Sequence, residues 1–185
     1  MLEDSRRYDD TGKEFYLQRK AILRLTISAM LLALSVIFGF FKIPLSQVSE
    51  VRLQFLPVAA EGMLFGPLYG GILGGLSDIL CYIVRPTGAF FPGFTISAII
   101  QGVIYGLLLR KNQSLGRILA TQALDTVIIS LILNPIWLMM LYGNSFVVIF
   151  MERIIKVLIM LPINTALLTA VVKLIYSPAI KPHLT

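Results

Sequence analysis

Ionisable side chains stand within or beside long apolar stretches of this sequence, where they cost free energy unless they face a cavity or a partner. They are Glu61, Asp78, Arg85, Asp125, Arg153 and Lys156. Aromatic residues suited to stacking on a flat ring accompany them: Phe90, Phe91, Phe94, Tyr105 and Trp137. Because aromatic faces and guanidinium groups suit a planar anionic molecule, these residue types indicate a small-molecule binding site.

Several of these residues also have a structural interpretation, which the sequence leaves open. Glu152 and Lys156 have the i, i+4 spacing of an ion pair on a helix, with the acidic residue first. Arg85 could instead extend its side chain to the lipid headgroups. Trp137 could anchor a helix at the membrane interface.

The signatures of catalysis and of ATP binding are absent from the sequence. It contains no G-x-x-x-x-G-K-[ST] phosphate loop, no H-E-x-x-H zinc motif and no G-x-S-x-G nucleophile elbow. Its single cysteine, Cys81, allows no internal disulfide or thiolate cluster, and its single histidine, His183, lies near the C-terminus. We therefore expect a protein that is not an enzyme and that needs no metal and no cofactor.

The elements that must position these residues are apolar helices. Hydrophobic residues make up 57% of the 185 residues and charged ones only 14%, against about 45–50% and about 25% in soluble domains. The uncharged runs 25–41 and 123–140 approach the roughly 20 residues that span a bilayer. The chain is therefore predicted to cross a membrane several times, and its net charge of +6 concerns topology rather than nucleic acid, which we do not expect it to bind.

We predict an all-α membrane protein with six transmembrane helices: Ile22–Phe41, Leu53–Phe65, Leu68–Val84, Thr95–Leu109, Leu115–Leu141 and Phe146–Tyr176. The second and third are separate because one helix from Arg52 to Arg85 would exceed the roughly 30 Å of the hydrocarbon core. Gly66-Pro67, near the middle of that stretch, supplies the break.

The last two spans each carry a proline near an asparagine. Asn134-Pro135 interrupts the fifth span, and Pro162 with Asn164 interrupts the sixth. An interrupted helix frees backbone carbonyls, which is tolerated in a membrane where the helix lines a cavity. We therefore expect both interruptions at the binding site.

Basic residues set the expected orientation of the chain. With six spans and both termini in the cytoplasm, most of them fall on the inner side, as the positive-inside rule prefers. The outer side keeps Lys42, Arg52, Arg85, Arg153 and Lys156. Residues 1–20 lack a signal-peptide pattern and are expected to form a solvated, partly disordered cytoplasmic tail. Residues 21–177 are expected to form the six-helix transmembrane domain that holds the binding site, and residues 178–185 a second cytoplasmic tail.

Small residues recur at intervals of four, a spacing that lets membrane helices approach closely. Glycines show it at Gly62, Gly66, Gly70 and Gly74, and again at Gly102 and Gly106. The first span carries Ala29-x-x-x-Ala33. For the alanines, the pattern alone does not separate packing within the chain from docking to another subunit.

Three segments together resemble a known family. They are LQFLPVAAEGMLFGPLYGGILGGLSDIL, GAFFPGFTISAIIQGVIYG and MERIIKVLIMLPIN. Their order resembles the S components of energy-coupling factor (ECF) vitamin transporters, closest to the folate-specific branch, over roughly residues 20 to 176. The resemblance implies a six-helix bundle in the cell membrane of a prokaryote that binds one vitamin near the outer face. Its partners would be a transmembrane T component and two cytoplasmic ATPases.

The resemblance also implies roles for individual residues. Ala29 and Ala33 match a motif that docks the T component. For folate, chemistry and position suggest Arg85, Arg153 or Lys156 for the carboxylates. The same reasoning places the remaining candidates around the rings: Phe91, Trp137 and Tyr105 for stacking, and Gln101, Asn134 and Asp78 for the pterin edge. Asp78 could instead be a structural group in the third helix. The aromatic loop 88–94 is expected to help close the pocket.

Other functions remain open at this point. Within the same class, the chain could bind another vitamin or act as a stand-alone facilitator. From a different class, a six-helix scaffold of the cell envelope would share the helical pattern but need no polar, aromatic pocket.

Overall fold

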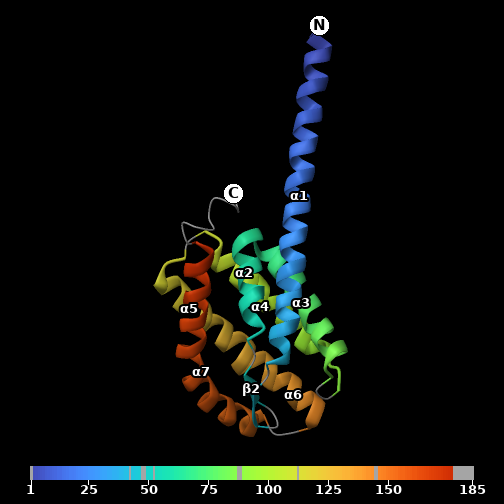
Figure 1. The fold of residues 1–185 in the computed structure, drawn as a ribbon. Coiled ribbons are helices and arrows are strands. Elements are labelled where there is room, and N and C mark those ends of the chain that lie inside the picture. Colours follow the sequence, from blue (N-terminus) through green and yellow to red (C-terminus); the bar gives the residue numbers. More distant parts are fainter. Residues whose placement is uncertain are drawn as a thin grey trace.

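The computed structural model describes residues 2–41, 43–46, 49–51, 53–86, 89–111, 113–143 and 146–176. Its elements follow in the order α1 Leu2–Phe40, β1 Ile43–Ser46, β2 Ser49–Val51, α2 Phe55–Phe65, α3 Pro67–Val84, α4 Pro92–Leu109, α5 Leu115–Asp125, η1 Thr126–Leu133, α6 Asn134–Tyr142 and α7 Phe146–Ile175. The α5, η1 and α6 segments form one continuous helical rod, so the six expected helices are confirmed (Figure 1).

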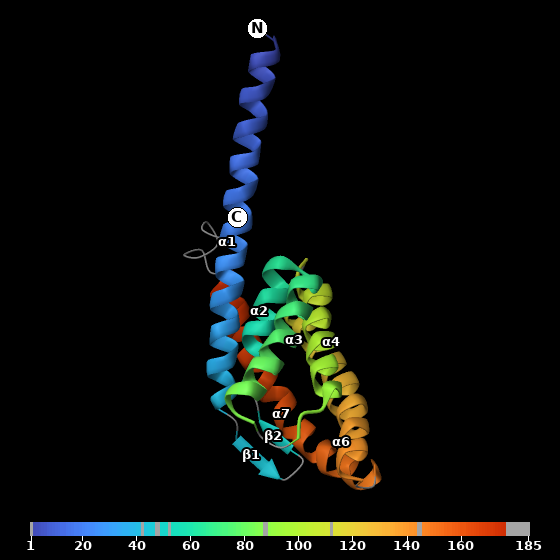
Figure 2. The ribbon, with the colours of Figure 1, turned by 90° about the vertical axis from the view of Figure 1, so that its right-hand side faces the viewer.

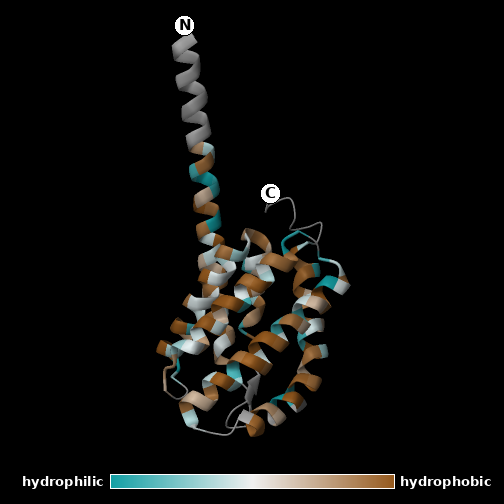
Figure 3. Cartoon of the chain, turned by 180° about the vertical axis from the view of Figure 1, so that it is seen from behind, coloured by the Kyte–Doolittle hydropathy of each residue, from teal (hydrophilic) through white to brown (hydrophobic). Residues whose placement is uncertain are grey.

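In the described part of the chain, 5 helical segments are long and apolar enough to cross a membrane. They are Phe15–Phe40 of α1, α3, α4, the rod Leu115–Tyr142, and Lys156–Ile175 of α7. The α2 helix is apolar but shorter. Large apolar side chains such as Leu68, Leu107 and Leu158 face outward with 62–72% of their surface exposed, and hydrophobic residues are frequent along the helices of the bundle (Figure 3). Such a surface suits lipid.

The first helix is longer than expected. Instead of a partly disordered tail, residues 2–20 continue α1 without a break, and this end projects well beyond the other helices (Figures 1 and 2). The sequence places Glu3 four residues before Arg7 and Asp9 four residues before Lys13. Because an acidic residue four positions before a basic one supports a helix, this charged segment favours the same helix that the apolar span requires.

The break between α2 and α3 lies where the sequence places it. Gly66 has a φ of 101°, a left-handed conformation that residues with a side chain rarely adopt, and Pro67 begins α3. The Gly66 amide still donates to the Gly62 carbonyl at 3.0 Å. The chain therefore changes direction without leaving that amide unpaired in the apolar interior.

Glycines bring α2, α3 and α4 into backbone contact. A Cβ atom on Gly62 would lie 2.8 Å from the amide nitrogen of Gly106, and one on Gly70 would lie 2.5 Å from the carbonyl oxygen of Gly102. A Cβ on Gly102 would in turn collide with the carbonyl of Gly70. The predicted small-residue pattern therefore packs the chain internally at these positions.

The rod that follows α4 changes its helical geometry in the middle. Residues Thr126–Leu133 form a π-helix, which ends where Asn134-Pro135 begins α6. Pro135 has no amide hydrogen and its ring crowds the preceding turn, so a wider turn before it relieves both problems. The α7 helix, in contrast, continues through Pro162, so the expected interruption of the sixth span does not end the helix.

A short antiparallel hairpin, β1–β2, joins α1 to α2 and was not expected from the sequence. Ile43 pairs with Val51 and Pro44 with Glu50. The hairpin lies at the end of the bundle opposite the projecting N-terminus (Figure 2). Apart from this hairpin, the described part of the chain is helical, and the predicted all-α fold class is confirmed.

Candidate binding pocket

A cavity of about 550 Å³ lies among α2, α3, α4, α7 and the rod from α5 to α6. Its size falls within the roughly 300–1,000 Å³ typical of small-molecule sites. The lining reaches from Arg85 and Tyr142, both exposed, to Tyr105 and Gln122, which are 0% and 1% exposed. The cavity is therefore a pocket with its mouth at the hairpin end of the bundle and its closed end inside.

Most of the side chains that the sequence singled out come together here. Those that line the cavity are Asp78, Arg85, Phe91, Gln101, Tyr105, Asn134, Arg153 and Lys156. Trp137 stands behind the wall, and Ala29 and Ala33 are exposed on α1. From the expected aromatic loop, Phe90, Phe91 and Phe94 line the pocket, whereas residues 87–88 lie outside the described residues.

Aromatic rings form one wall of the pocket near its mouth. The Phe91 ring lies 5.8 Å from that of Trp137 and 6.1 Å from that of Phe94, measured between centroids. The Trp137 indole donates a 3.0 Å hydrogen bond to Ser97 Oγ, which fixes its orientation. A Cβ on Gly93 would lie 2.5 Å from atoms of both Phe91 and Trp137, so the glycine makes room for this packing. The wall therefore presents Phe91 to the cavity with Trp137 supporting it.

Polar side chains gather at the closed end. Gln101 Nε2 donates to both carboxyl oxygens of Asp125, at 3.0 and 3.1 Å. Next to them, the Tyr105 hydroxyl donates to Gln122 Oε1 at 3.2 Å. All four residues line the cavity, and Asp125 is only 6% exposed. The closed end is thus a polar floor in an otherwise apolar membrane protein.

The sequence analysis assigned neither Gln122 nor Asp125 to a part of the ligand. Asp125 stood out as an ionisable residue in a span, and Gln122 did not stand out at all. A usable signal was nevertheless present, because the two residues are three positions apart and share one face of a helix. That face continues to Ile129, which also lines the cavity.

Basic side chains approach the cavity from α7. Arg153 is 6% exposed, and its Nη1 donates to the Ser130 carbonyl of the π-helix at 3.3 Å. Lys156, about one turn further along α7, is half-buried and lines the same cavity. The side chain of Glu152 lies outside the described residues, so its predicted ion pair with Lys156 remains a prediction.

Arg85 and Asp78 also serve to join helices. Arg85 Nη1 donates to the Phe40 carbonyl at 2.8 Å, which ties the end of α3 to the end of α1. Asp78 accepts a 2.8 Å hydrogen bond from Thr95 Oγ1, which ties α3 to α4. Both residues therefore combine a structural contact with a place in the pocket lining.

A second polar group that the sequence analysis missed lies on the α2–α3 side. Gln54 Nε2 donates to Ser77 Oγ at 3.1 Å, and Ser77 Oγ donates to the Gly74 carbonyl at 2.9 Å. Both residues line the cavity. Gln54 falls inside the predicted span Leu53–Phe65, but it is uncharged, so a search for ionisable residues in spans does not mark it.

Comparison with known proteins identifies the family. Residues 23–179 match the model of the ECF transporter, substrate-specific component. The chain belongs to this family. As a substrate-specific component it is the substrate-binding subunit of a transporter and not an enzyme.

Individual relatives and a solved structure agree with this assignment. The folate transporter FolT of Clostridium novyi (strain NT) is 38% identical over 148 residues, covering 80% of this chain and 86% of the relative. FolT of Leuconostoc mesenteroides is 28% identical over 166 residues, covering 86% and 89%. The crystal structure of FolT bound with folic acid matches with a TM-score of 0.74 at 30% identity, covering 80% of this chain and 92% of that one.

Proposed function

We propose that this substrate-specific component binds folate in the pocket and passes it to an ECF import complex. The observation that carries the proposal is the pocket's composition, in which a phenylalanine wall and three basic side chains line one cavity of about 550 Å³. A flat pterin, a benzoyl ring and a glutamate with two carboxylates need surfaces of these kinds. The identity to folate transporters supports folate over other vitamins.

The lining residues divide into three roles under this proposal. Phe91 stacks on a ring of the ligand, with Trp137 behind it. Arg153 and Lys156 pair with the carboxylates, and Arg85 adds positive charge at the mouth. Gln101, Asn134 and Asp78 bind polar edges of the rings, with Tyr105 at the floor.

The orientation and the partners follow the family. Both termini lie in the cytoplasm, so the pocket mouth faces the outside of a prokaryotic cell membrane. A transmembrane T component docks on α1 at Ala29 and Ala33, whose exposure leaves them available to another chain. Two cytoplasmic ATPases supply the energy.

Equilibrium binding of folate to the purified protein in detergent tests this proposal. Trp137 is the only tryptophan and packs against Phe91, so bound folate should quench its fluorescence. We expect saturable quenching, and an affinity lowered at least about tenfold by Lys156→Ala, because a charged partner of the carboxylates is lost.

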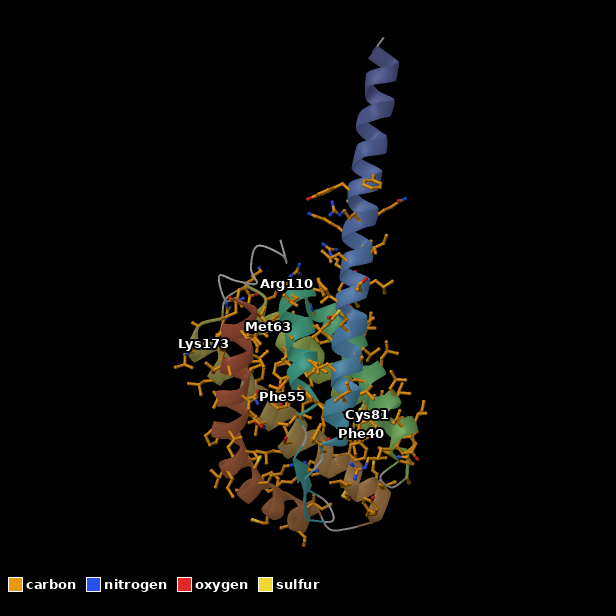
Figure 4. All side chains as sticks on the ribbon, viewed as in Figure 1. Phe40, Phe55, Met63, Cys81, Arg110 and Lys173 are labelled. Atoms are coloured by element: carbon orange, nitrogen blue, oxygen red, sulfur yellow. The ribbon has the colours of Figure 1, made fainter. Side chains whose placement is uncertain are left out.

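Lys173→Ala is the matched control. Lys173 lies on the same helix, exposed, at the end near Arg110 and away from the pocket mouth (Figure 4). Its removal should leave the affinity unchanged. Tight binding of a different vitamin without folate binding would keep the class and refute the substrate. Binding of no vitamin at all would favour a scaffold.

A further inference from the structure

We propose that Asp125, held by Gln101, selects the heterocycle of the ligand by accepting hydrogen bonds from two adjacent N–H groups. This inference rests on the proposed function. In folate, such groups are the 2-amino group and the ring N3–H of the pterin. The pterin then lies on the floor of the pocket and the glutamate extends toward Arg153, Lys156 and the mouth.

The first step of the argument is what Asp125 still lacks. A carboxylate offers about four lone-pair sites, and Gln101 Nε2 occupies one on each oxygen. The Tyr105 hydroxyl, which donates to Gln122, also interacts with the Asp125 carboxyl group. Gln101 is an uncharged donor, and Asp125 is 6% exposed in a membrane-spanning rod. A buried carboxyl group with unused acceptor sites costs free energy until donors reach it. Because Asp125 lines the cavity, a ligand is placed to supply them.

The second step concerns the geometry of those donors. Two parallel N–H groups on one planar edge bind both oxygens of a carboxylate at once, as an arginine guanidinium does. The 2-amino-4-oxopyrimidine edge of a pterin carries such a pair. Gln101 contacts both oxygens of Asp125 and therefore fixes the plane and rotation of the carboxyl group before a ligand arrives.

The third step is the separation of charge along the pocket. Asp125 ends α5 near the floor, whereas Arg153 contacts the carbonyl of Ser130, further along the rod toward the mouth. The carboxyl group therefore lies deeper than the guanidinium. A ligand with N–H donors at one end and carboxylates at the other has one favourable orientation in such a pocket, with the ring inward.

Asp78 is the other acidic residue in the lining and does not offer the same site. Its Oδ2 accepts a hydrogen bond from Thr95 Oγ1 between α3 and α4, whereas Asp125 stands on the rod. Asp78 is also only half-buried. A carboxyl group that water reaches discriminates less between ligands that supply donors and ligands that do not.

A double-mutant cycle between protein and ligand tests the proposal. The two proteins are the wild type and Asp125→Asn. The two ligands are folate and its analogue in which a methyl group replaces the 2-amino group. We expect the wild type to bind folate at least about tenfold tighter than the analogue. In Asp125→Asn this preference should fall to within about threefold. An unchanged preference in the variant, or none in the wild type, would overturn the inference.

Three further measurements make each outcome interpretable. Glu61→Gln should keep the wild-type preference, because it removes a buried carboxyl group that is not part of the pocket lining. The fragment p-aminobenzoylglutamate, which lacks the pterin, should bind wild type and Asp125→Asn alike. If Asp125→Asn fails to fold, Gln101→Ala replaces it and should also reduce the preference, since the carboxyl group loses its fixed orientation.

Failure of the inference differs from failure of the proposed function. A wild type that binds neither folate nor the fragment contradicts folate binding itself. A wild type that binds folate tightly, with the same preference in Asp125→Asn, contradicts only the assignment of the floor.

Discussion

The two sides of α4 serve opposite purposes. One side places Gly102 and Gly106 against the backbones of α3 and α2, with no room for a side chain. The other side directs Gln101 and Tyr105 into the pocket, where each makes a polar contact. One helix therefore makes close backbone contacts through its glycines and, less than one turn away, contributes side chains to the pocket lining.

This difference explains how a membrane protein without a large hydrophobic driving force keeps an open polar pocket. Between helices in lipid, stability comes from close packing and hydrogen bonds. The glycine side fixes the position of α4 through backbone contacts, so the pocket side need not be filled to hold the helix. Binding residues are then carried by a rigid element, as an accurate site requires.

The largest expected effect comes from filling the glycine side. In Gly102→Leu the new side chain meets the Gly70 backbone, which cannot move as a flexible side chain would. We expect a loss of stability of at least about 3 kcal/mol, the upper end for overpacked cores. Thermal unfolding in detergent and the elution profile on size exclusion would measure it. A variant that melts like the wild type would show that α4 is held by other contacts.

The aromatic wall should affect binding more than stability. Phe91→Ala removes the ring that faces the cavity, and stacking of an aromatic side chain on a flat base contributes about 1–3 kcal/mol. We expect folate affinity to fall about 10- to 100-fold, measured by calorimetry because the Trp137 signal also depends on Phe91.

Phe65→Ala is the control for this substitution. Phe65 is at the end of α2, with its ring 5.9 Å from that of Tyr69, and it is not among the lining residues of the pocket. Its loss should lower stability without changing folate affinity. Equal affinity losses in both variants would mean that the Phe91 effect is a general loosening of the bundle.

A second buried carboxyl group sharpens the comparison between packing and binding. Glu61 is 1% exposed between α1 and α2, away from the pocket lining, and Ser28 Oγ donates to its Oε1. In the described part of the chain its Oε2 has no hydrogen-bond partner. Whereas Asp125 faces a cavity that a ligand fills, Glu61 faces helix α1, so Ser28 is a structural donor.

Ser28→Ala should therefore lower the stability of the protein without changing its affinity for folate. Removing the hydroxyl leaves a buried carboxyl group with one donor fewer, which costs about 1–3 kcal/mol. Folate affinity should remain at the wild-type value in the same preparation. Glu61→Gln is the paired variant, since its amide oxygen still accepts from Ser28; it should be less destabilising than Ser28→Ala, and the reverse order would contradict this account.

The sequence predicted the helices well because bilayer thickness and breaker residues act locally. Gly66-Pro67 ends one helix and starts the next whatever surrounds it, and the apolar spans have a length that the membrane dictates. The π-helix 126–133 and the hairpin 43–51 were not predicted. The π-helix directly precedes Pro135 and the hairpin pairs residues only a few positions apart, and a search for apolar spans detects neither feature.

The candidate site was predicted by residue type but not by arrangement. The search for ionisable residues in or beside spans found the charged residues of the lining, because such residues are costly unless they face a cavity or a partner. That criterion overlooks Gln122 and Gln54, which are uncharged. It also does not predict which side chains form hydrogen bonds with one another. That Gln101 holds Asp125, or that Arg85 contacts Phe40, emerges only when separate helices are brought together.

The smallest expected effect concerns a glycine outside the close-packed side. Gly116 lies in the first turn of α5, exposed, and a Cβ added there would meet nothing within 4 Å. Gly116→Ala should stabilise the protein by up to about 0.5–1 kcal/mol, because alanine loses less backbone entropy in a helix. Thermal unfolding should therefore shift slightly upward, with folate affinity unchanged. Since Gly102→Ala should instead destabilise, the opposite signs of the same substitution would separate glycines that bring helices together from one that does not; equal signs would refute the distinction.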